Sequence, residues 1–300
     1  MKLEPTKKNI ALVTPTYTED LERFRLLCES IDTHVNGFER HYVVVADADV
    51  SRFAEFSGAK RVILPYSKFV PHWLKLLPHL RWKHGRRIWW SYRTGLIHGW
   101  HLQQVVKLAT AAHMPEERYC IIDSDNVFFR PFDVSAYAGS KLAPLFVNPR
   151  AIEADAPLHS AWTKNCQHLL GLHELNFPAD DYIGQNIVWD KTVVQSLLST
   201  IEKVSGLNWI ETLCRTKRFS EYLLYGTFVQ KFPDYMHRHL FDSESITLTY
   251  WDAMPLNESG VRKLLESAPA TKVALSVSSR SNTPLSAIRD AVGFLSFLKS

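Results

Sequence analysis

Three short apolar segments of this chain each run directly into a cluster of polar or acidic residues. The segments are residues 10–13, 42–46 and 119–122, and the clusters after them are Thr14–Pro15–Thr16–Tyr17, Asp47–Ala48–Asp49 and Asp123–Ser124–Asp125. Short apolar runs bounded by turn residues are typical of buried strands. Ligands of open α/β sheets bind beyond the carboxyl ends of the strands. We therefore expect the three clusters to lie together at one edge of a sheet.

Helical periodicity separates these predicted strands. Apolar residues recur at spacings of three and four from Leu21 to Val35, which predicts one buried helix face with Thr18 as its N-cap. A second helix is predicted over residues 96–112, with Lys107 on the face opposite its apolar residues. Alternating strands and helices predict an α/β domain with a mixed, mainly parallel sheet flanked by helices.

The second half of the chain is less regular. Residues 140–185 are rich in Pro, His and Asn and have the composition of long loops. The elements predicted after them are helices over 193–204, from Ser220 onward and over 285–298, and a strand over 273–277. Because no linker is evident, we expect a single domain over residues 1–300, with a sheet half at 1–135 and an elaborated half at 136–300.

Composition and charge narrow the class of protein. The chain has four widely spaced cysteines without a CxxC pair, no apolar run long enough to span a bilayer and no signal-peptide h-region. These features predict a reduced, soluble, cytoplasmic protein. The net charge is +4, but residues 56–115 hold ten Lys and Arg and no acid. Such a stretch would attract an anion such as a nucleoside diphosphate, or simply form a solvated basic face.

Asp123 and Asp125 are the strongest candidates for chemistry. Two carboxylates two residues apart beyond a buried strand can hold Mg²⁺ or Mn²⁺ together with substrate phosphates. An ordinary turn at the end of a strand is the simpler interpretation. An EF-hand loop is excluded, because its sixth position would be Phe128 rather than Gly.

Three segments resemble nucleotide-sugar-dependent glycosyltransferases of the GT-A fold. IALVTPTYTED looks like their opening strand and turn, and KLATAAHMPEERYCIIDSDNVFFRPFD looks like their DxD region. FSEYLLYGTFV is similar to a helix in a bacterial, largely uncharacterised branch. The resemblance covers roughly residues 8–235. It implies a GT-A-like fold in which the first half binds the nucleotide and the second half faces the acceptor.

The resemblance also implies roles for individual residues. The donor nucleotide, UDP-sugar by default, would contact Thr14, Pro15, Thr16, Tyr17, Asp47, Lys107, Asp123 and Ser124. The metal ion would be held by Asp123, Asp125 and His239, with His237 as the alternative histidine. Glu221 would be the general base toward a hydroxyl acceptor, and Asp125 would act in catalysis through the metal. The implied reaction is metal-dependent sugar transfer to a saccharide or a lipid-linked saccharide in surface polysaccharide or glycolipid synthesis.

Two other functions remain open from the sequence. In a phosphotransferase of the haloacid dehalogenase kind, Asp123 would be the nucleophile and Asp125 the acid/base, although that motif usually opens the domain. In a non-enzymatic protein, the basic stretch would bind a polyanion or a membrane surface. No nucleic-acid-binding signature, P-loop or GxGxxG occurs, so we expect no nucleic-acid partner; peripheral contact with a membrane is compatible with the sequence.

Overall fold

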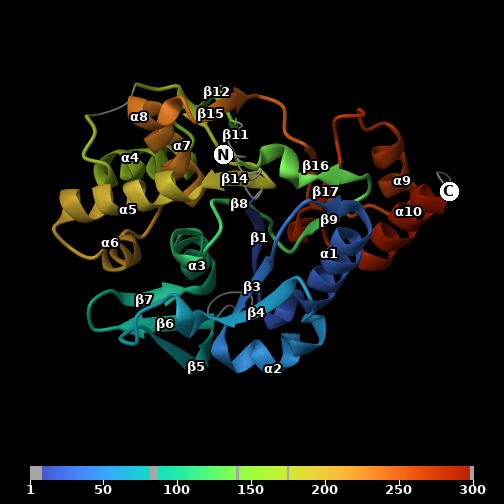
Figure 1. Ribbon diagram of the computed structural model, residues 1–300, viewed down its shortest axis with the longest axis horizontal. Helices are drawn as coiled ribbons and strands as arrows, with labels where there is room; N and C mark the ends of the chain where they lie inside the picture. Colours follow the sequence, from blue (N-terminus) through green and yellow to red (C-terminus); the bar gives the residue numbers. More distant parts are fainter. Residues whose placement is uncertain (1–8, 82–86, 140–141, 174–175, 298–300) are drawn as a thin grey trace, which may run out of the picture.

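The computed structural model describes residues 9–81, 87–139, 142–173 and 176–297. Its centre is a five-stranded sheet in the order β14-β8-β1-β3-β4 (Figure 1). The strands are β1 (Ile10–Pro15), β3 (His41–Val45), β4 (Arg61–Pro65), β8 (Arg118–Ile121) and β14 (Ile187–Asp190). All pairs are parallel except β14 with β8. The predicted mixed, mainly parallel α/β fold is confirmed.

Successive residues of the central strands enter different cores. Ala11 and Val13 of β1 belong to one hydrophobic cluster, whereas Ile10 and Leu12 belong to another. The first cluster packs against α3 (Gly99–His113), α5 (Lys191–Ser205) and α7 (Glu221–Lys231), and the second against α1 (Leu21–His34) and α2 (Val50–Phe53). Side chains alternate along a strand, so apolar runs without alternation are needed to bury both faces.

The order of the sheet creates a switch point between β1 and β8. From β1 the chain passes to β3 and β4 on one side, and then returns to β8 on the other side. Loops leaving β1 and β8 at their carboxyl ends therefore diverge, and ligands of open α/β sheets bind in the resulting crevice. Tyr17 follows β1 and Asp123 follows β8, so the topology places two predicted site residues at this crevice.

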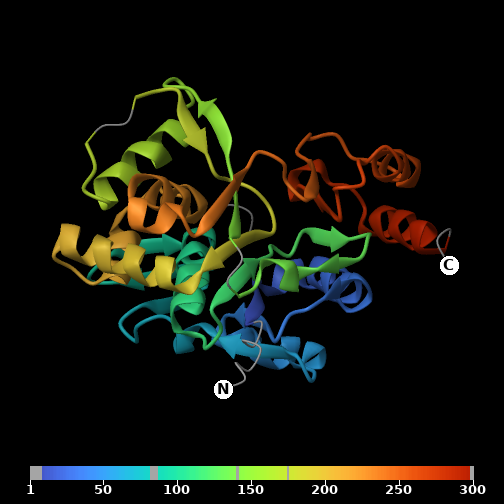
Figure 2. The same cartoon turned by 45° about the horizontal axis from the view of Figure 1, so that its top comes forward.

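Smaller sheets surround the central one (Figure 2). Two are three-stranded: β5 (Lys75–Arg81), β6 (Arg87–Ser91), β7 (Gly95–His98); and β16 (Thr247–Tyr250), β17 (Ala274–Val277), β9 (Asn126–Phe128). The paired strands are β2 (Val35–Asn36) with β10 (Phe132–Asp133), β11 (Ala143–Phe146) with β15 (His239–Asp242), and β12 (Asn148–Ile152) with β13 (Ala179–Asp181). The remaining helices are α4 (His159–Leu169), α6 (Trp209–Arg215), α8 (Pro233–Met236), α9 (Glu258–Glu266) and α10 (Leu285–Phe297).

The structure confirms one local prediction and differs from three others. Ser220 caps α7 as predicted, since its side chain accepts from the Leu223 N–H. Thr18 is not a cap: its hydroxyl donates to Asp49 instead. The helix predicted from residue 96 begins at Gly99, because residues 95–98 pair with β6. The predicted loop region 140–185 contains the helix α4 and the strands β11, β12 and β13. Strand β11 pairs with the distant β15, and β12 pairs with β13 across the helix α4 in the sequence.

Two further features concern the length of the helices and the state of the cysteines. No helix in the described ranges is long and apolar enough to cross a membrane. The four cysteines are buried free thiols. Burial raises the pKa of Cys28, Cys120, Cys166 and Cys214 to about 12, so these thiols stay protonated and behave as small apolar side chains.

Candidate functional site

A cleft opens at the carboxyl ends of β1 and β3. We name it the Tyr17 cleft; its lining residues are Tyr17, Ala46, Tyr66, Arg87, Trp89, Gly99, Trp100 and Gln103. Tyr17 comes from the turn after β1, Arg87 and Trp89 from β6, and Trp100 and Gln103 from the first turns of α3. Four aromatic side chains and one guanidinium make this a cleft for a flat, polar or anionic group.

Arg87 is fixed in the cleft by a buried acid. Its Nη1 lies 2.6 Å from Asp49 Oδ2, and its Nη2 donates to Asp49 Oδ1 at 2.7 Å. Asp49 is only 4% exposed and also accepts from Thr18 Oγ1. A bidentate arginine–carboxylate pair fixes the plane of the guanidinium. Asp49 is therefore the acid that orients Arg87 in the cleft. Asp47, which we predicted to contact the nucleotide, is exposed and accepts a hydrogen bond from the Ser67 N–H.

One face of α3 connects this cleft to the Asp123–Asp125 turn. Trp100, Gln103 and Lys107 follow at helical spacing, so their side chains lie on one side of the helix. At 1.5 Å per residue, Trp100 and Lys107 are about 10 Å apart along the axis. Burial raises the pKa of Tyr66 in the cleft, and the charges of Arg87, Asp49 and Lys107 also act on that phenol. The cleft and the turn are thus neighbouring parts of one site.

Lys107 is the centre of a buried polar cluster. Its Nζ lies 2.7 Å from Asp123 Oδ1 and 2.8 Å from Glu221 Oε1, and it donates to the Tyr222 hydroxyl at 3.0 Å. Lys107 is 5% exposed and Glu221 is 3% exposed. Burial disfavours the ammonium, but Asp123 and Glu221 together raise the Lys107 pKa well above its usual value. The polar helix face predicted for Lys107 is therefore buried against acids rather than solvated.

Asp125 carries a strongly raised pKa. Burial is the main cause, the neighbouring Asp123 carboxylate adds to it, and the pKa reaches about 7. Asp20 contributes further repulsion, while Arg23 partly offsets it. Asp20 itself accepts hydrogen bonds from Ser124 Oγ at 3.0 Å and from Tyr17. A third carboxylate, which the sequence did not single out, thus joins the Tyr17 cleft to the turn.

Asp123 and Asp125 fit a hard divalent cation only in part. Within the described ranges no three His, Cys, Asp or Glu side chains are arranged to hold a metal ion. Lys107 occupies one oxygen of Asp123, which leaves Oδ2 of Asp123 and the Asp125 carboxylate as donors. Mg²⁺ is often held by one or two carboxylates, with phosphate and water as its other ligands. The donor chemistry therefore suits a cation that arrives with a phosphorylated substrate.

Other predicted residues lie outside this site. Thr14, Pro15 and Thr16 are buried in β1 or at its end, and Thr14 Oγ1 bonds His41 Nε2 at 3.0 Å in the core. Of the predicted TPTY turn, only Tyr17 lines the cleft. Because the strand continues to Pro15 and the side chains of these three residues are buried, a nucleotide would meet them mainly through their backbone, and their contact with a nucleotide stays a prediction.

The structure does not bring His239 to the Asp123–Asp125 turn. His239 Nε2 bonds the Tyr225 hydroxyl at 2.8 Å, and that hydroxyl also accepts from the Asp190 N–H. Asp190 pairs with Arg118 at the start of β8, which is the opposite end of the strand from Asp123. The other ring nitrogen of His239, Nδ1, lies 3.1 Å from the Tyr235 carbonyl oxygen. His239 is therefore a buried structural residue, and we remove it from the predicted metal ligands; His237 is exposed beyond α8.

Four of the ten basic residues in the stretch 56–115 form ion pairs with acids from other parts of the chain. Arg61 pairs with Asp32, Arg87 with Asp49, Arg93 with Glu211, and Lys107 with Asp123 and Glu221. Residues 82–86 of the stretch lie outside the described ranges. The charge of these four residues is thus offset by acids, whereas Lys60, Lys68 and Lys75 form no ion pair with the described residues.

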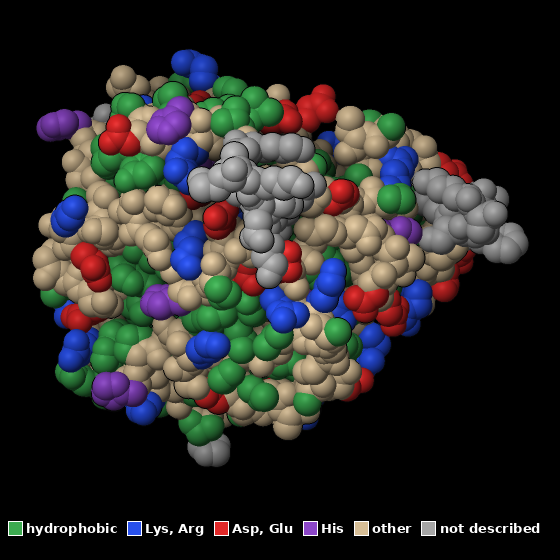
Figure 3. All heavy atoms as spheres, viewed as in Figure 1, with side chains coloured by type: hydrophobic (Ala, Val, Ile, Leu, Met, Phe, Trp, Pro, Cys, Tyr) green, Lys and Arg blue, Asp and Glu red, His purple; other side chains and the backbone are tan. Residues whose placement is uncertain are grey.

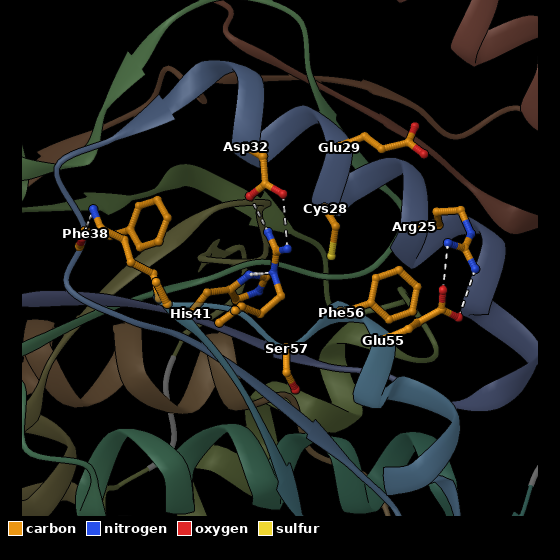
Figure 4. Close-up of a pocket in the computed structure, with 13 residues that line it drawn as sticks. Arg25, Cys28, Glu29, Asp32, Phe38, His41, Glu55, Phe56 and Ser57 are labelled. Atoms are coloured by element: carbon orange, nitrogen blue, oxygen red, sulfur yellow. Dashed lines mark hydrogen bonds and ion pairs between the residues drawn. The ribbon is translucent and has the colours of Figure 1, made fainter.

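A larger cavity of about 470 Å³ lies away from this site (Figure 4). Cys28 and Asp32 enter it from α1, His41 from the first residue of β3, and Glu55 and Phe56 from the turn after α2. It sits at the amino end of β3, opposite the crevice where α/β sheets bind ligands. Asp32 bonds Arg61 and Glu55 bonds Arg25, so its main charges are already paired.

Comparison with protein families places the chain. A family model described as "Family of unknown function (DUF6492)" matches residues 7–269. The chain belongs to this family. None of the curated proteins compared with the chain matches it. The part shared by the DUF6492 family includes the Tyr17 cleft, the Asp123–Asp125 turn, Lys107 and Glu221, and it ends before β17.

Proposed function

We propose that the protein is a GT-A-like, metal-dependent glycosyltransferase that moves a sugar from a nucleoside diphosphate to a hydroxyl acceptor. One observation carries the proposal: an aromatic cleft and a pair of carboxylates lie at the switch point of the sheet, and one helix, α3, supplies Trp100 to the cleft and, about 10 Å further along its axis, Lys107 to Asp123. A nucleoside diphosphate needs this combination, a stacking surface for a base beside a site for a cation and phosphates.

Each group at the site has a part in this reaction. Tyr17 would stack on the nucleobase, and the guanidinium of Arg87, held by Asp49, would donate to the base or ribose. Asp125 and the second oxygen of Asp123 would hold Mg²⁺ or Mn²⁺. When bound, that ion would neutralise the charge that develops on the departing diphosphate. The Lys107 ammonium, 2.7 Å from Asp123 Oδ1, holds this carboxylate in place.

The predicted base Glu221 takes a different role in this proposal. Its carboxylate is 3% exposed and faces Lys107, so it positions the lysine rather than contacting an acceptor hydroxyl. A general base must come within about 3 Å of the proton that it removes. The acceptor, a saccharide or lipid-linked saccharide by the family resemblance, and a cytoplasmic location remain parts of the proposal.

Thermal stability with ligands tests the proposal. UDP, GDP, CDP, dTDP and ADP are each added with and without Mn²⁺. A ligand at about a hundred times its Kd stabilises the fold by about 2.7 kcal/mol. We expect a manganese-dependent shift with one nucleotide, lost in Asp125→Asn and kept in the control Asp252→Asn, whose side chain is exposed. No shift with any nucleotide would argue against the proposal.

A phosphotransferase is the second candidate, because one observation favours it. Burial raises the pKa of Asp125 to about 7, which suits this residue to act as a general acid beside a nucleophilic Asp123, whose Oδ1 lies 2.7 Å from Lys107 Nζ. Hydrolysis of p-nitrophenyl phosphate, with capture of the enzyme by beryllium fluoride, would support this function. Sugar-nucleotide hydrolysis without phosphatase activity would support the transferase.

A further inference from the structure

The sheet of β5, β6 and β7 has two unlike faces. Trp89 of β6 points into the core, where its ring lies 5.9 Å from Tyr66. Trp90 is the next residue, so its side chain points to the opposite face. There it stands in register with Lys75 of β5 and Leu96 of β7. We name this row of Lys75, Trp90 and Leu96 the outer β6 face.

The outer β6 face leaves large apolar side chains in water. Trp90 is 44% exposed and Leu96 is 60% exposed. Tyr92, in the turn between β6 and β7, is 73% exposed, and Leu80 of β5 is 45% exposed. Figure 3 shows one face of the molecule, on which hydrophobic side chains are mixed with basic, acidic and histidine side chains. Contiguous exposed apolar side chains mark interaction surfaces, whereas single ones do not.

The segment that forms this sheet carries basic residues and no acid of its own. Residues 56–115, which include all three strands, contain no acid. Lys75 is exposed and, among the described residues, makes no ion pair, in contrast to Arg87 and Arg93 of the same sheet. An exposed tryptophan, tyrosine and leucine beside an unpaired lysine therefore meet the solvent together. An apolar protein surface would match the aromatic rings but not the lysine.

We propose that the outer β6 face docks on the surface of an anionic membrane. Trp and Tyr favour the interface between lipid headgroups and acyl chains, because their rings are apolar and their N–H or O–H groups are polar. Leu96 would enter the acyl boundary, and Lys75 would contact anionic headgroups, each basic residue near the surface contributing favourably. The contact is peripheral, since it uses side chains of a sheet rather than a spanning segment.

Docking would orient the candidate site toward the membrane. The inner face of the same sheet supplies Arg87 and Trp89 to the Tyr17 cleft. The cleft and the proposed docking face therefore lie on opposite faces of one sheet. An acceptor held in the membrane would be close to the cleft. The membrane contact itself does not depend on nucleotide binding, so the two proposals can fail separately.

Vesicle co-sedimentation of the full chain tests the docking face. The vesicles are phosphatidylcholine alone, or the same lipid with about one third phosphatidylglycerol. We expect binding to the anionic vesicles only, weakened at high salt because exposed charges are screened. The double variant Trp90→Ala/Leu96→Ala should lose at least about tenfold in affinity for the anionic vesicles. Lys75→Glu should also bind them more weakly. The matched control is Trp251→Ala, which removes a tryptophan that is 63% exposed elsewhere.

Three outcomes would overturn the proposal. They are no binding to either vesicle, an equal loss in Trp251→Ala, and unchanged binding in the double variant. If gel filtration without vesicles shows a dimer that the double variant dissociates, and no vesicle binding occurs, the face is an interface between two copies of the chain. Thermal unfolding without ligand is measured on every variant; an unchanged Tm shows that the variants are folded, whether or not a nucleotide binds.

Discussion

Lys107 forms a buried ion pair with Glu221, a residue 114 positions further along the chain. Substituting Lys107→Met would leave Glu221 buried without its cation and Asp123 without its partner. Breaking a buried ion pair by removing one partner costs about 3–5 kcal/mol. We therefore expect urea unfolding to show a loss of this size in the free energy of unfolding.

A double-mutant cycle separates the ion pair from packing. Lys107→Met/Glu221→Gln removes both charges, so the double variant should lose clearly less stability than the sum of the two single losses. Additive losses would mean that Lys107 contributes mainly through contacts other than the Glu221 ion pair, such as that of its Nζ with the Tyr222 ring, whose centroid is 4.7 Å away.

Asp125 gives a prediction with a defined sign in pH. Because its pKa is about 7 in the folded protein and near 4 in an unfolded chain, the folded state binds the extra proton between these values. Stability is therefore lost as the pH rises from about 4 to about 7, because the unfolded chain releases this proton before the folded protein does, and no more is lost above pH 7. Asp125→Asn should be more stable than wild type at pH 8 by at least about 1 kcal/mol, and this advantage should disappear at pH 4, where both states of the wild type hold the proton.

The measurement for Asp125 is thermal unfolding at both pH values with EDTA present. A gain of about 1 kcal/mol corresponds to a Tm rise of roughly 2 °C for a chain of this size. Asp252→Asn controls for the loss of one surface charge. A difference between Asp125→Asn and wild type that does not change with pH would contradict the raised pKa.

Helix α7 supplies Glu221 and Tyr222 to the Lys107 cluster, and Gly226 allows this helix to pack closely against Tyr182. A Cβ on Gly226 would overlap the ring of Tyr182, which is itself 2% exposed. Gly226→Ala should therefore destabilise the protein by about 1–3 kcal/mol, although alanine favours a helix. Gly293→Ala in α10 is the matched control, because nothing lies within 4 Å of its Cβ; it should stabilise by about 0.5–1 kcal/mol. Similar effects of the two changes in urea unfolding would refute the close packing.

Elements were predictable where local pattern and burial agree. The strand from Ile10, the helix from Leu21 and the Ser220 cap follow from apolar spacing and capping chemistry. Residues 140–185 were not, since β11 and β12 owe their extended form to partners at 239–242 and 179–181. β7 was hidden inside a helical pattern for the same reason, because its pairing with β6 outweighs local preference.

The site followed the same division. Asp123, Asp125 and Tyr17 could be located because strand ends share an edge, whether or not their functional roles are correct. The pairing of Arg87 with Asp49 and of Lys107 with Glu221 depends on contacts 38 and 114 residues apart, which no local pattern encodes. A signal for Arg87 existed in the period of two on β6, since Arg87 and Trp89 share the inner face.

At the scale of the whole molecule, one hydrophobic cluster brings together segments that lie far apart in the sequence. It contains Leu26 of α1, Val127 of β9, Leu275 of β17 and Ile288 of α10. Leu275 is 1% exposed and stands opposite Val127, directly after the Asp123–Asp125 turn. The last segments of the chain therefore support the turn that we propose as the cation site, even though the family match ends at residue 269.

This arrangement predicts that a core change near the carboxyl terminus weakens the entire fold. Leu275→Ala should lower the free energy of unfolding by about 2–5 kcal/mol, as deletion of a buried leucine does elsewhere. Far-UV and near-UV circular dichroism should show one coincident transition, because the cluster ties α9 and α10 to α1 and β9. The control Leu158→Ala, at a leucine 46% exposed, should stay within about 0.5 kcal/mol of wild type. Two separate transitions in Leu275→Ala would instead mean that the carboxyl-terminal helices unfold on their own, and that the turn keeps its shape without them.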